Sequence, residues 1–304
     1  MTHFLIESLR LLPVAYGVAI TSLAGAAVGQ SSIRCWGQVG YNTEGRERTY
    51  VQVAALMNQT AVLRADGRVF VNGQNWGGAL QVPDLPPGLA YTEVGVSVNG
   101  GAAVRSDGAI VVWSISTGPL GMPPLFPSAP TLPPGRRYLQ VAVGELHMLA
   151  LRSDGAIIAW GNNQFGQCNV PPLPPGVSVI RLRSCMATSY AVLGDGSIVA
   201  WGSNAFGVAQ VPPLPTGVGY LDVHAAHSHC LAVRSDGFVF AWGDNQVGQC
   251  NVPPLPPGMF YIAASAGWGH SQAGRSDGVI VAWGDNGLGQ CNVPTLPPGV
   301  VSFR

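Results

Sequence analysis

Three of the six histidines occupy the same place in a repeated pattern, and they are the residues best suited to chemistry. His147, His229 and His270 each stand seven residues before the aspartate of an Asp-Gly pair. The same place holds Gln59, Gly100 and Thr188 elsewhere in the chain. Imidazoles that ligate a metal or transfer protons must converge on one point, and rotated copies of one position do not. We interpret these histidines as structural side chains; a metal shared across a central channel is the alternative.

The aspartates and cysteines follow the same pattern. An Asp-Gly pair is typical of a turn, so its carboxylate is not half of an acid–base pair. Cys168, Cys250 and Cys291 fill one loop position, and with Cys35, Cys185 and Cys230 they form no Cys-x-x-Cys motif. The sequence has no phosphate-binding loop, nucleophile elbow or His-Glu zinc motif. We predict a non-enzymatic protein without cofactor or metal; an enzyme would need histidines and carboxylates that converge in the channel.

The pattern is an internal repeat with a period of 41 residues. A sixteen-residue phrase occurs four times, at 161–176, 202–217, 243–258 and 284–299. A Trp-Gly pair begins at Trp36, Trp160, Trp201, Trp242 and Trp283, with weaker copies at Asn72 and Trp113. Six residues before six of these seven positions lies an Asp-Gly pair. This constant offset indicates one structural unit that is repeated along the chain.

One unit, residues 218–258, predicts three or four short antiparallel strands. Residues 220–226, 230–235 and 238–243 are rich in residues that favour strands. Asp236-Gly237 predicts a two-residue type I′ turn, because glycine accepts the positive φ of that turn. The prolines that follow cannot donate to a ladder, so we interpret them as a rigid connector between units; a motif for an SH3-like partner is the alternative. Such units predict an all-β fold, a β-propeller.

Seven Trp-Gly positions predict a seven-bladed propeller in residues 31–304. Residues 300–304 match the first strand of a further unit, and residues 31–37 would supply its last strand, so the two ends would close the ring in one blade. Residues 1–30 have two interpretations. As a signal peptide they predict a secreted or cell-envelope protein; as a degenerate strand of the closing blade they are compatible with a cytoplasmic one.

The composition narrows the class of partner. The formal net charge is zero and 10% of the residues are charged, which argues against a nucleic-acid-binding surface. We expect no membrane span in the mature chain, and a monomer. A rigid, weakly charged scaffold favours a protein or a glycan as its ligand.

The segment RSDGFVFAWGDNQVGQ, residues 234–249, resembles the regulator of chromosome condensation repeat family. The resemblance extends over roughly residues 45–304 and implies a propeller. The family's founder exchanges nucleotide on a small GTPase at chromatin, which implies a GTPase-regulating alternative. The 41-residue unit is more similar to the propeller-type β-lactamase inhibitor proteins, which implies an inhibitor as another alternative. The resemblance also implies a structural role for the repeated histidine.

Function is expected where the repeats differ. The loop before the histidine position varies from unit to unit, and its copies are predicted to ring one face around the channel. The candidate ligand-binding residues are Met57, Asn58, Asn99, Glu145, Leu146, Met186, His227 and Trp268. The expected structural repeat residues are His147, His229, His270, Trp160, Trp201, Trp242 and Trp283. Trp268 is the one large ring among the candidates; packing against a neighbouring blade is its alternative role.

The other irregularity is an insertion at residues 114–131. It is rich in proline and contains Leu120, Met122, Leu125 and Phe126. It is either an interaction loop on the outer rim or drift in a degenerate unit.

Overall fold

The computed structural model describes residues 50–56, 59–73, 80–114 and 126–293. Within them the chain forms six three-stranded antiparallel sheets, each built from three consecutive strands. The strands are β1 (Tyr50–Leu56), β2 (Gln59–Arg64), β3 (Val69–Gly73); β4 (Tyr91–Ser97), β5 (Gly100–Arg105), β6 (Ile110–Ser114); β7 (Tyr138–Val143), β8 (His147–Arg152), β9 (Ile157–Gly161); β10 (Val179–Cys185), β11 (Thr188–Leu193), β12 (Ile198–Gly202); β13 (Tyr220–Ala225), β14 (His229–Arg234), β15 (Val239–Gly243); β16 (Tyr261–Ala266), β17 (His270–Arg275) and β18 (Ile280–Gly284). A single helical turn, η1 (Ala205–Gly207), follows β12.

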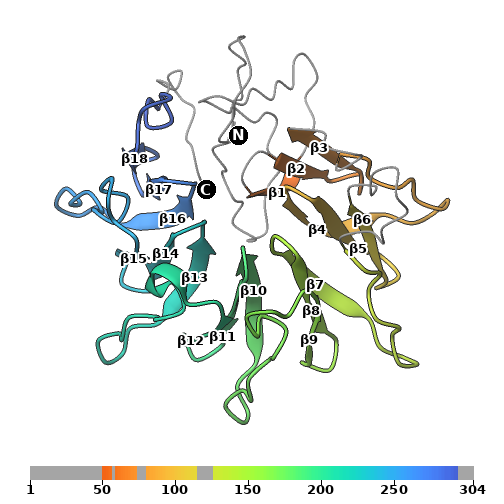
Figure 1. Cartoon of the computed structure of the whole chain (residues 1–304). Coiled ribbons are helices and arrows are strands. Elements are labelled where there is room, and N and C mark those ends of the chain that lie inside the picture. Colours follow the sequence, from red (N-terminus) through yellow and green to blue (C-terminus); the bar gives the residue numbers. More distant parts are fainter. Residues whose placement is uncertain (1–49, 57–58, 74–79, 115–125, 294–304) are drawn as a thin grey trace.

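The six sheets are arranged around a common centre (Figure 1). The first strand of each sheet is the innermost, and these strands contact one another in order from β1 through β4, β7, β10 and β13 to β16. An all-β propeller is therefore confirmed, with six blades in the described part of the chain. The segments predicted to close a seventh blade, residues 1–37 and 300–304, lie outside the described residues.

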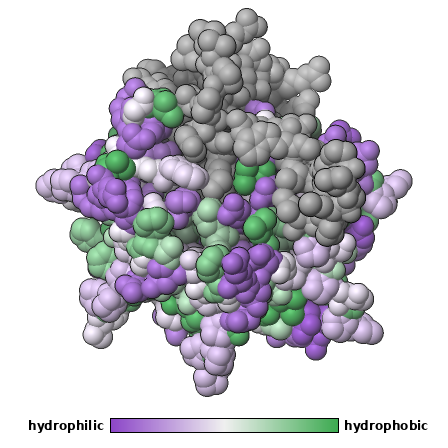
Figure 2. All heavy atoms as spheres, viewed as in Figure 1, coloured by the Kyte–Doolittle hydropathy of each residue, from purple (hydrophilic) through white to green (hydrophobic). Residues whose placement is uncertain are grey.

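Each proline-rich segment connects the outer strand of one blade to the inner strand of the next, as predicted. The described parts of the connectors contain no strand, and they project at the rim (Figure 1). On the face drawn in Figure 2 the projecting tips are hydrophilic, and apolar and polar residues are mixed towards the centre. A tyrosine at the start of four inner strands anchors the connectors, because its hydroxyl donates to a proline carbonyl. The pairs are Tyr91–Pro83, Tyr138–Pro130, Tyr220–Pro212 and Tyr261–Pro253, at 2.8–2.9 Å.

The Asp-Gly turns differ in type from the prediction. Gly237 has a positive φ of 82°, as expected, but Asp236 does not share the left-handed conformation that a type I′ turn requires. The N–H of Gly237 donates to the carbonyl of Arg234 at 3.0 Å, and the N–H of Arg234 donates to the carbonyl of Phe238 at 2.9 Å. The turn is therefore a three-residue hairpin loop, a type I turn closed by a left-handed glycine.

The hydrophobic core lies between neighbouring sheets. One cluster joins Tyr190 and Val192 of β11 to Val223 of β13 and Trp242 of β15. The repeated tryptophans also bridge blades through their indole N–H. Trp201 and Trp283 donate to the carbonyls of Gln167 and Gln249, each in the loop that follows the preceding blade, at 2.9 Å. This contact explains why a large aromatic residue recurs at this position.

The glycine after each repeated tryptophan is required by the backbone. Gly243 has φ +107°, and a Cβ at that position would lie 2.5 Å from the carbonyl oxygen of Ser228. We expect Gly243→Ala to lower the free energy of unfolding by about 2–4 kcal/mol, from left-handed strain together with a backbone clash. Gly269→Ala is the matched control, because its Cβ would meet no atom closer than 3.5 Å. Urea denaturation of both variants measures the difference, and equal stabilities would contradict this account of the repeat.

The insertion at residues 114–131 is described only in part, since residues 115–125 lie outside the described residues. Phe126 is buried in the core between the second and third sheets, and the carbonyl of Pro127 accepts the indole N–H of Trp160 at 3.1 Å. This end of the insertion therefore packs inside the molecule and is not available to a partner at the rim. In the described part of the chain, no helix is long and apolar enough to cross a membrane.

Candidate functional site

The variable loops form one face of the propeller, which we call the loop face. It consists, where the structure describes them, of the loops before the second strand of a blade and the loops after the third strand. Backbone bonds join the two kinds of loop: the N–H of Asn162 donates to the carbonyl of Leu146, and that of Asp244 to the carbonyl of Ser228, both at 2.8 Å. The Asp-Gly turns lie at the other end of the same strands.

The candidate loops contact one another from blade to blade. The side-chain N–H of Asn99 donates to the carbonyl of Glu145 at 2.9 Å. The backbone N–H of Glu145 donates in turn to the carbonyl of Met186 at 3.0 Å. Met186 has φ +48°, a left-handed conformation that is strained for a residue with a side chain. Within the described residues, these hydrogen bonds connect the loop face across three successive blades.

Three aromatic side chains from successive blades lie side by side on this face. The rings of His227 and Trp268 are stacked, with centroids 4.2 Å apart and an angle of 21° between the planes. The ring of Phe206 also neighbours His227: their centroids are 5.9 Å apart, and the planes are tilted by 49°. Phe206 is 53% exposed and Trp268 is 38% exposed. We call Phe206, His227 and Trp268 the aromatic arc.

Phe206 belongs to the arc because its own loop departs from the repeat. In the next blade, the side chain of Gln249 accepts the N–H of Val247 at 3.0 Å and donates to Asp244 at 2.9 Å. The blade of Phe206 has Val208 in place of the glutamine and Ser203 in place of the aspartate. Without those two bonds the loop forms the turn η1, and Phe206 takes φ +60°.

The aromatic arc is strained as well as exposed. In the described residues, the non-glycine residues with positive φ are Met186 and Phe206, and both lie on the loop face. The positions equivalent to Phe206 are also apolar and exposed, and they are Phe165, Val247 and Leu288. Strained backbone and exposed large apolar side chains are both typical of binding sites. The loop face is therefore the candidate site for a macromolecular partner.

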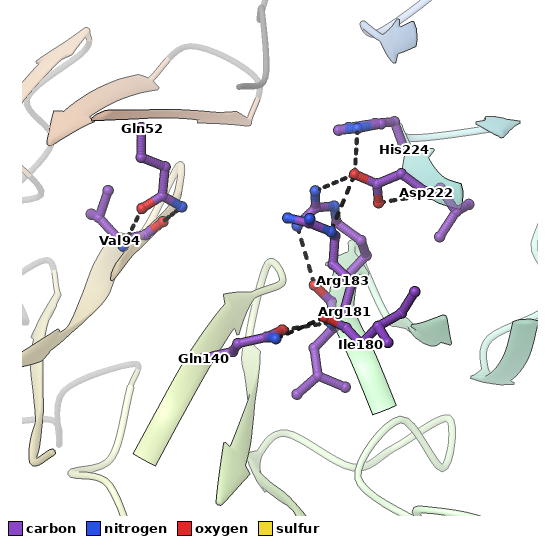
Figure 3. Close-up of polar contacts among 10 residues, drawn as sticks. Gln52, Val94, Gln140, Ile180, Arg181, Arg183, Asp222 and His224 are labelled. Carbon is purple, nitrogen blue, oxygen red and sulfur yellow. Dashed lines mark hydrogen bonds and ion pairs between the residues drawn. The ribbon is translucent and has the colours of Figure 1, made fainter. Parts of the chain in front are cut away.

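The central channel holds a second polar cluster, formed by the inner strands. Each inner strand has a bulge, and the residues that follow it are Gln52, Glu93, Gln140, Arg181, Asp222 and Ala263. Two of them complete the sheet edges: Gln52 exchanges two hydrogen bonds with the backbone of Val94, at 2.9 and 3.0 Å, and Gln140 bonds β10 in the same way (Figure 3). Glu93, Arg181 and Asp222, the charged residues at this position, lack an amide group and cannot both donate and accept in this way.

Asp222 is the centre of the charged cluster (Figure 3). Its carboxylate lies 2.7 Å from Arg183, 3.5 Å from Arg181 and 3.5 Å from His224. Burial alone would raise the pKa of Asp222, but these neighbours, Arg183 first, hold it well below the ordinary value. Burial lowers the pKa of His224. The channel thus contains a histidine and a carboxylate in contact, but the carboxylate is also paired with two arginines.

The repeat and the fold both have known counterparts. A family model described as the regulator of chromosome condensation (RCC1) repeat matches residues 139–167, which span β7 to β9 and the loop after them. This segment of the chain is therefore similar to an RCC1 repeat. A comparison with curated protein sequences found no match.

Solved structures of several other proteins share the fold of this chain. Prp20p from Saccharomyces cerevisiae superimposes with a TM-score of 0.67 at 19% identity, over 84% of this chain and 76% of that one. Human WBSCR16 gives 0.66 at 17% identity, over 93% and 87%. The ectodomain of the Physcomitrella patens receptor kinase CR4 gives 0.59 at 16% identity, over 85% and 66%. These likenesses concern the fold.

The repeated histidines link neighbouring blades. Nε2 of His147 lies 2.9 Å from the hydroxyl of Ser189, which donates to the carbonyl of Gln167 at 2.9 Å. His229 and Ser271 form the same pair at 2.8 Å, one blade apart. Burial lowers the pKa of His147, His229 and His270 to about 4 each. The described residues contain no group of three or more His, Cys, Asp or Glu side chains that could hold a metal.

The structure brings some predicted site residues together and adds others. It joins Asn99, Glu145 and Met186 in one chain of contacts and His227 to Trp268, while Met57 and Asn58 lie outside the described residues. Trp268 packs on His227 of the neighbouring blade, and its side chain stays partly exposed. Sequence reasoning missed Phe206 and the channel cluster. The replacement of the repeated glutamine by Val208 was the available signal for the first.

Proposed function

We propose that this chain is a non-enzymatic binding scaffold whose partner is a protein that docks on the aromatic arc. The observation that carries the proposal is the arc itself: three rings from three blades, two of them substantially exposed, with Phe206 held in a left-handed conformation. Rigid aromatic side chains are favoured anchors of protein interfaces, because they bury much area and lose little conformational entropy.

The partner's surface is expected to be apolar at its centre. The arc offers two exposed aromatic rings, from Phe206 and Trp268, beside a histidine. Neutral overall charge gives no long-range attraction to polyanions. Prp20p, similar in fold, was described with its binding properties to Gsp1p and histones, and this precedent supports a protein ligand for the scaffold. A glycan is the competing outcome of the test.

The loop of Phe206 provides a test that leaves the aromatic side chains in place. Ser203→Asp with Val208→Gln restores the two hydrogen bonds that the neighbouring blade makes. We expect Phe206 to return to a negative φ, as at Phe165, to leave the His227 ring, and to lower partner affinity by about tenfold. Backbone scalar couplings report the φ, and a binding titration with the partner captured by the wild-type chain reports the affinity.

The matched control for this test is Phe165→Ala, which removes an exposed ring at the equivalent loop outside the arc. This control is expected to change the affinity by less than threefold, since peripheral contacts contribute little. Unchanged affinity in the double variant, with Phe206 shown to have moved, would contradict the proposed function.

A further inference from the structure

The inner strands enclose a cavity at the centre of the propeller, with a volume of about 230 Å³. Its walls come from β1, β4, β7, β10 and β13, and among the described residues its titratable lining consists of Glu93, Arg181, Arg183 and His224. Arg181 and Arg183 are two residues apart on one strand, so they stand on the same side of the sheet. This cavity is separate from the aromatic arc, which is built from loops.

The charges that face the cavity do not cancel. Arg181 and Arg183 contribute two positive charges, and ionised Asp222 compensates one of them. His224 is neutral at pH 7, because burial lowers its pKa. Burial also raises the pKa of Glu93 to about 7, although both arginines act against the rise. Near and below neutral pH the site therefore has an excess of positive charge in a partly desolvated place, which is unfavourable without an anion.

One donor in the cluster is also unused. The Nε–H of Arg183 is buried and has no hydrogen-bond partner among the described residues. Its other nitrogens bond Asp222 at 2.7 Å and the carbonyl of Leu182 at 3.4 Å (Figure 3). A buried unsatisfied N–H of a charged group is costly, and an oxyanion is the partner that guanidinium geometry fits best.

We propose that the central cavity is a binding site for a small oxyanion, a molecule that carries a phosphate or a carboxylate group. Arg181 and Arg183 bind the anion, and Glu93 in its protonated form faces it as a hydrogen-bond donor. Gln52 and Gln140 occupy the equivalent positions after the bulge in β1 and β7. They bond the backbone of the neighbouring inner strand, so the charged side chains at the other positions remain for the ligand. The cavity has room for a small organic anion beyond the charged group itself.

The experiment is calorimetric titration of the folded full-length chain with sulfate at constant ionic strength, at pH 6 and pH 8. Sulfate keeps its charge over this range, so a change in affinity belongs to the protein. The titratable and charged groups at the site are Glu93, Arg181, Arg183, Asp222 and His224. We expect one saturable site that binds about tenfold more weakly at pH 8, where Glu93 is ionised. Titrations with phosphate and succinate then distinguish a phosphate-bearing from a carboxylate-bearing ligand.

Three variants assign the binding to the cavity. Arg183→Ala is expected to weaken sulfate binding at least tenfold. Glu93→Gln is expected to tighten sulfate binding about tenfold at pH 8 and to remove its pH dependence. This variant still tests the proposal if Arg183→Ala does not fold. Arg152→Ala, at an arginine paired with Asp154 beside its hairpin turn, is the control and should leave binding unchanged. Absence of saturable binding, or binding that neither cavity variant alters, would overturn the proposal.

Discussion

Acidification from pH 6.5 to pH 4 should lower the free energy of unfolding by several kcal/mol. His147, His229 and His270 are buried, and burial lowers the pKa of each to about 4. In the unfolded chain a histidine has a pKa near 6.5, so between these values the unfolded state binds more protons and stability rises with pH. The stability from these neutral imidazoles is complete above pH 6.5 and is lost as the pH falls through 4. Each contributes about 3 kcal/mol at most.

Other groups do not reverse this expectation. Glu93 acts in the opposite direction between pH 4.5 and 7, because its pKa in the folded chain is raised, but it is one group against three. The lowered pKa values of Asp154 and Asp222 shift stability at pH values below their ordinary titration range, outside this window. His224, whose pKa burial also lowers, acts in the same direction as the three repeated histidines. The net slope between pH 4.5 and 6.5 is therefore set mainly by the three repeated histidines.

A variant tests this assignment. Replacement of His147, His229 and His270 by glutamine follows the chain itself, which has Gln59 in the same place, and Gln59 donates to the carbonyl of Val98 of the next blade at 3.1 Å. Urea denaturation at pH 7, 6, 5 and 4.5 measures the slope in both proteins. We expect the variant to lose most of the dependence on pH. An equally steep slope in the variant would show that other groups are responsible.

Removal of the aromatic arc should abolish partner binding while the chain stays folded. Phe206→Ala, His227→Ala and Trp268→Ala together delete three adjacent rings, and we expect at least a hundredfold loss of affinity, since truncated anchors at an interface centre commonly contribute more than 2 kcal/mol each. The effect on stability should be small, because Phe206 and Trp268 are largely exposed. Titration of the captured partner against wild-type and triple-variant chains gives the ratio.

The control for the triple variant lies at the other end of the strands. Phe238 and Phe260 are 54% and 49% exposed beside the Asp-Gly turn, and their replacement by alanine removes comparable exposed area. We expect this pair of substitutions to leave the affinity within threefold of wild type. A similar loss in both variants would mean that exposed apolar area in general drives the association, and the loop face would have no special part in it.

The fold could be predicted from the sequence because its signals are local and repeated. The constant offset between Asp-Gly and Trp-Gly places two strands and a turn in each unit that has both pairs. The prolines that follow cannot donate backbone hydrogen bonds, which disfavours a fourth strand. The predicted turn type was wrong because a type I′ turn and a type I turn closed by glycine both place that glycine in the left-handed conformation. The letters Asp-Gly do not show whether the aspartate is left-handed too. The hydrogen bonds around Gly237 decide between them.

The candidate site was predictable only in part. His227 and Trp268 were found because their loop varies visibly from unit to unit. Phe206 was hidden because it occupies a position that is apolar in all four copies of the sixteen-residue phrase. The change that matters is the loss of a glutamine side chain two residues later, at Val208. The cavity residues were hidden because a bulge shifts the alternation of the inner strands, so that a period of two does not show that Arg181 and Asp222 face the centre.

The central claim, that a protein partner docks on the aromatic arc, is tested most directly by site-specific photo-crosslinking. A photoreactive phenylalanine analogue is placed at position 268 in one protein and at position 238 in another, and each is illuminated in an extract of the source cells. We predict that position 268 crosslinks to one protein and that position 238, at the opposite end of the strands, does not. Crosslinks to that protein from position 238 alone, or to glycan alone from position 268, would contradict the account.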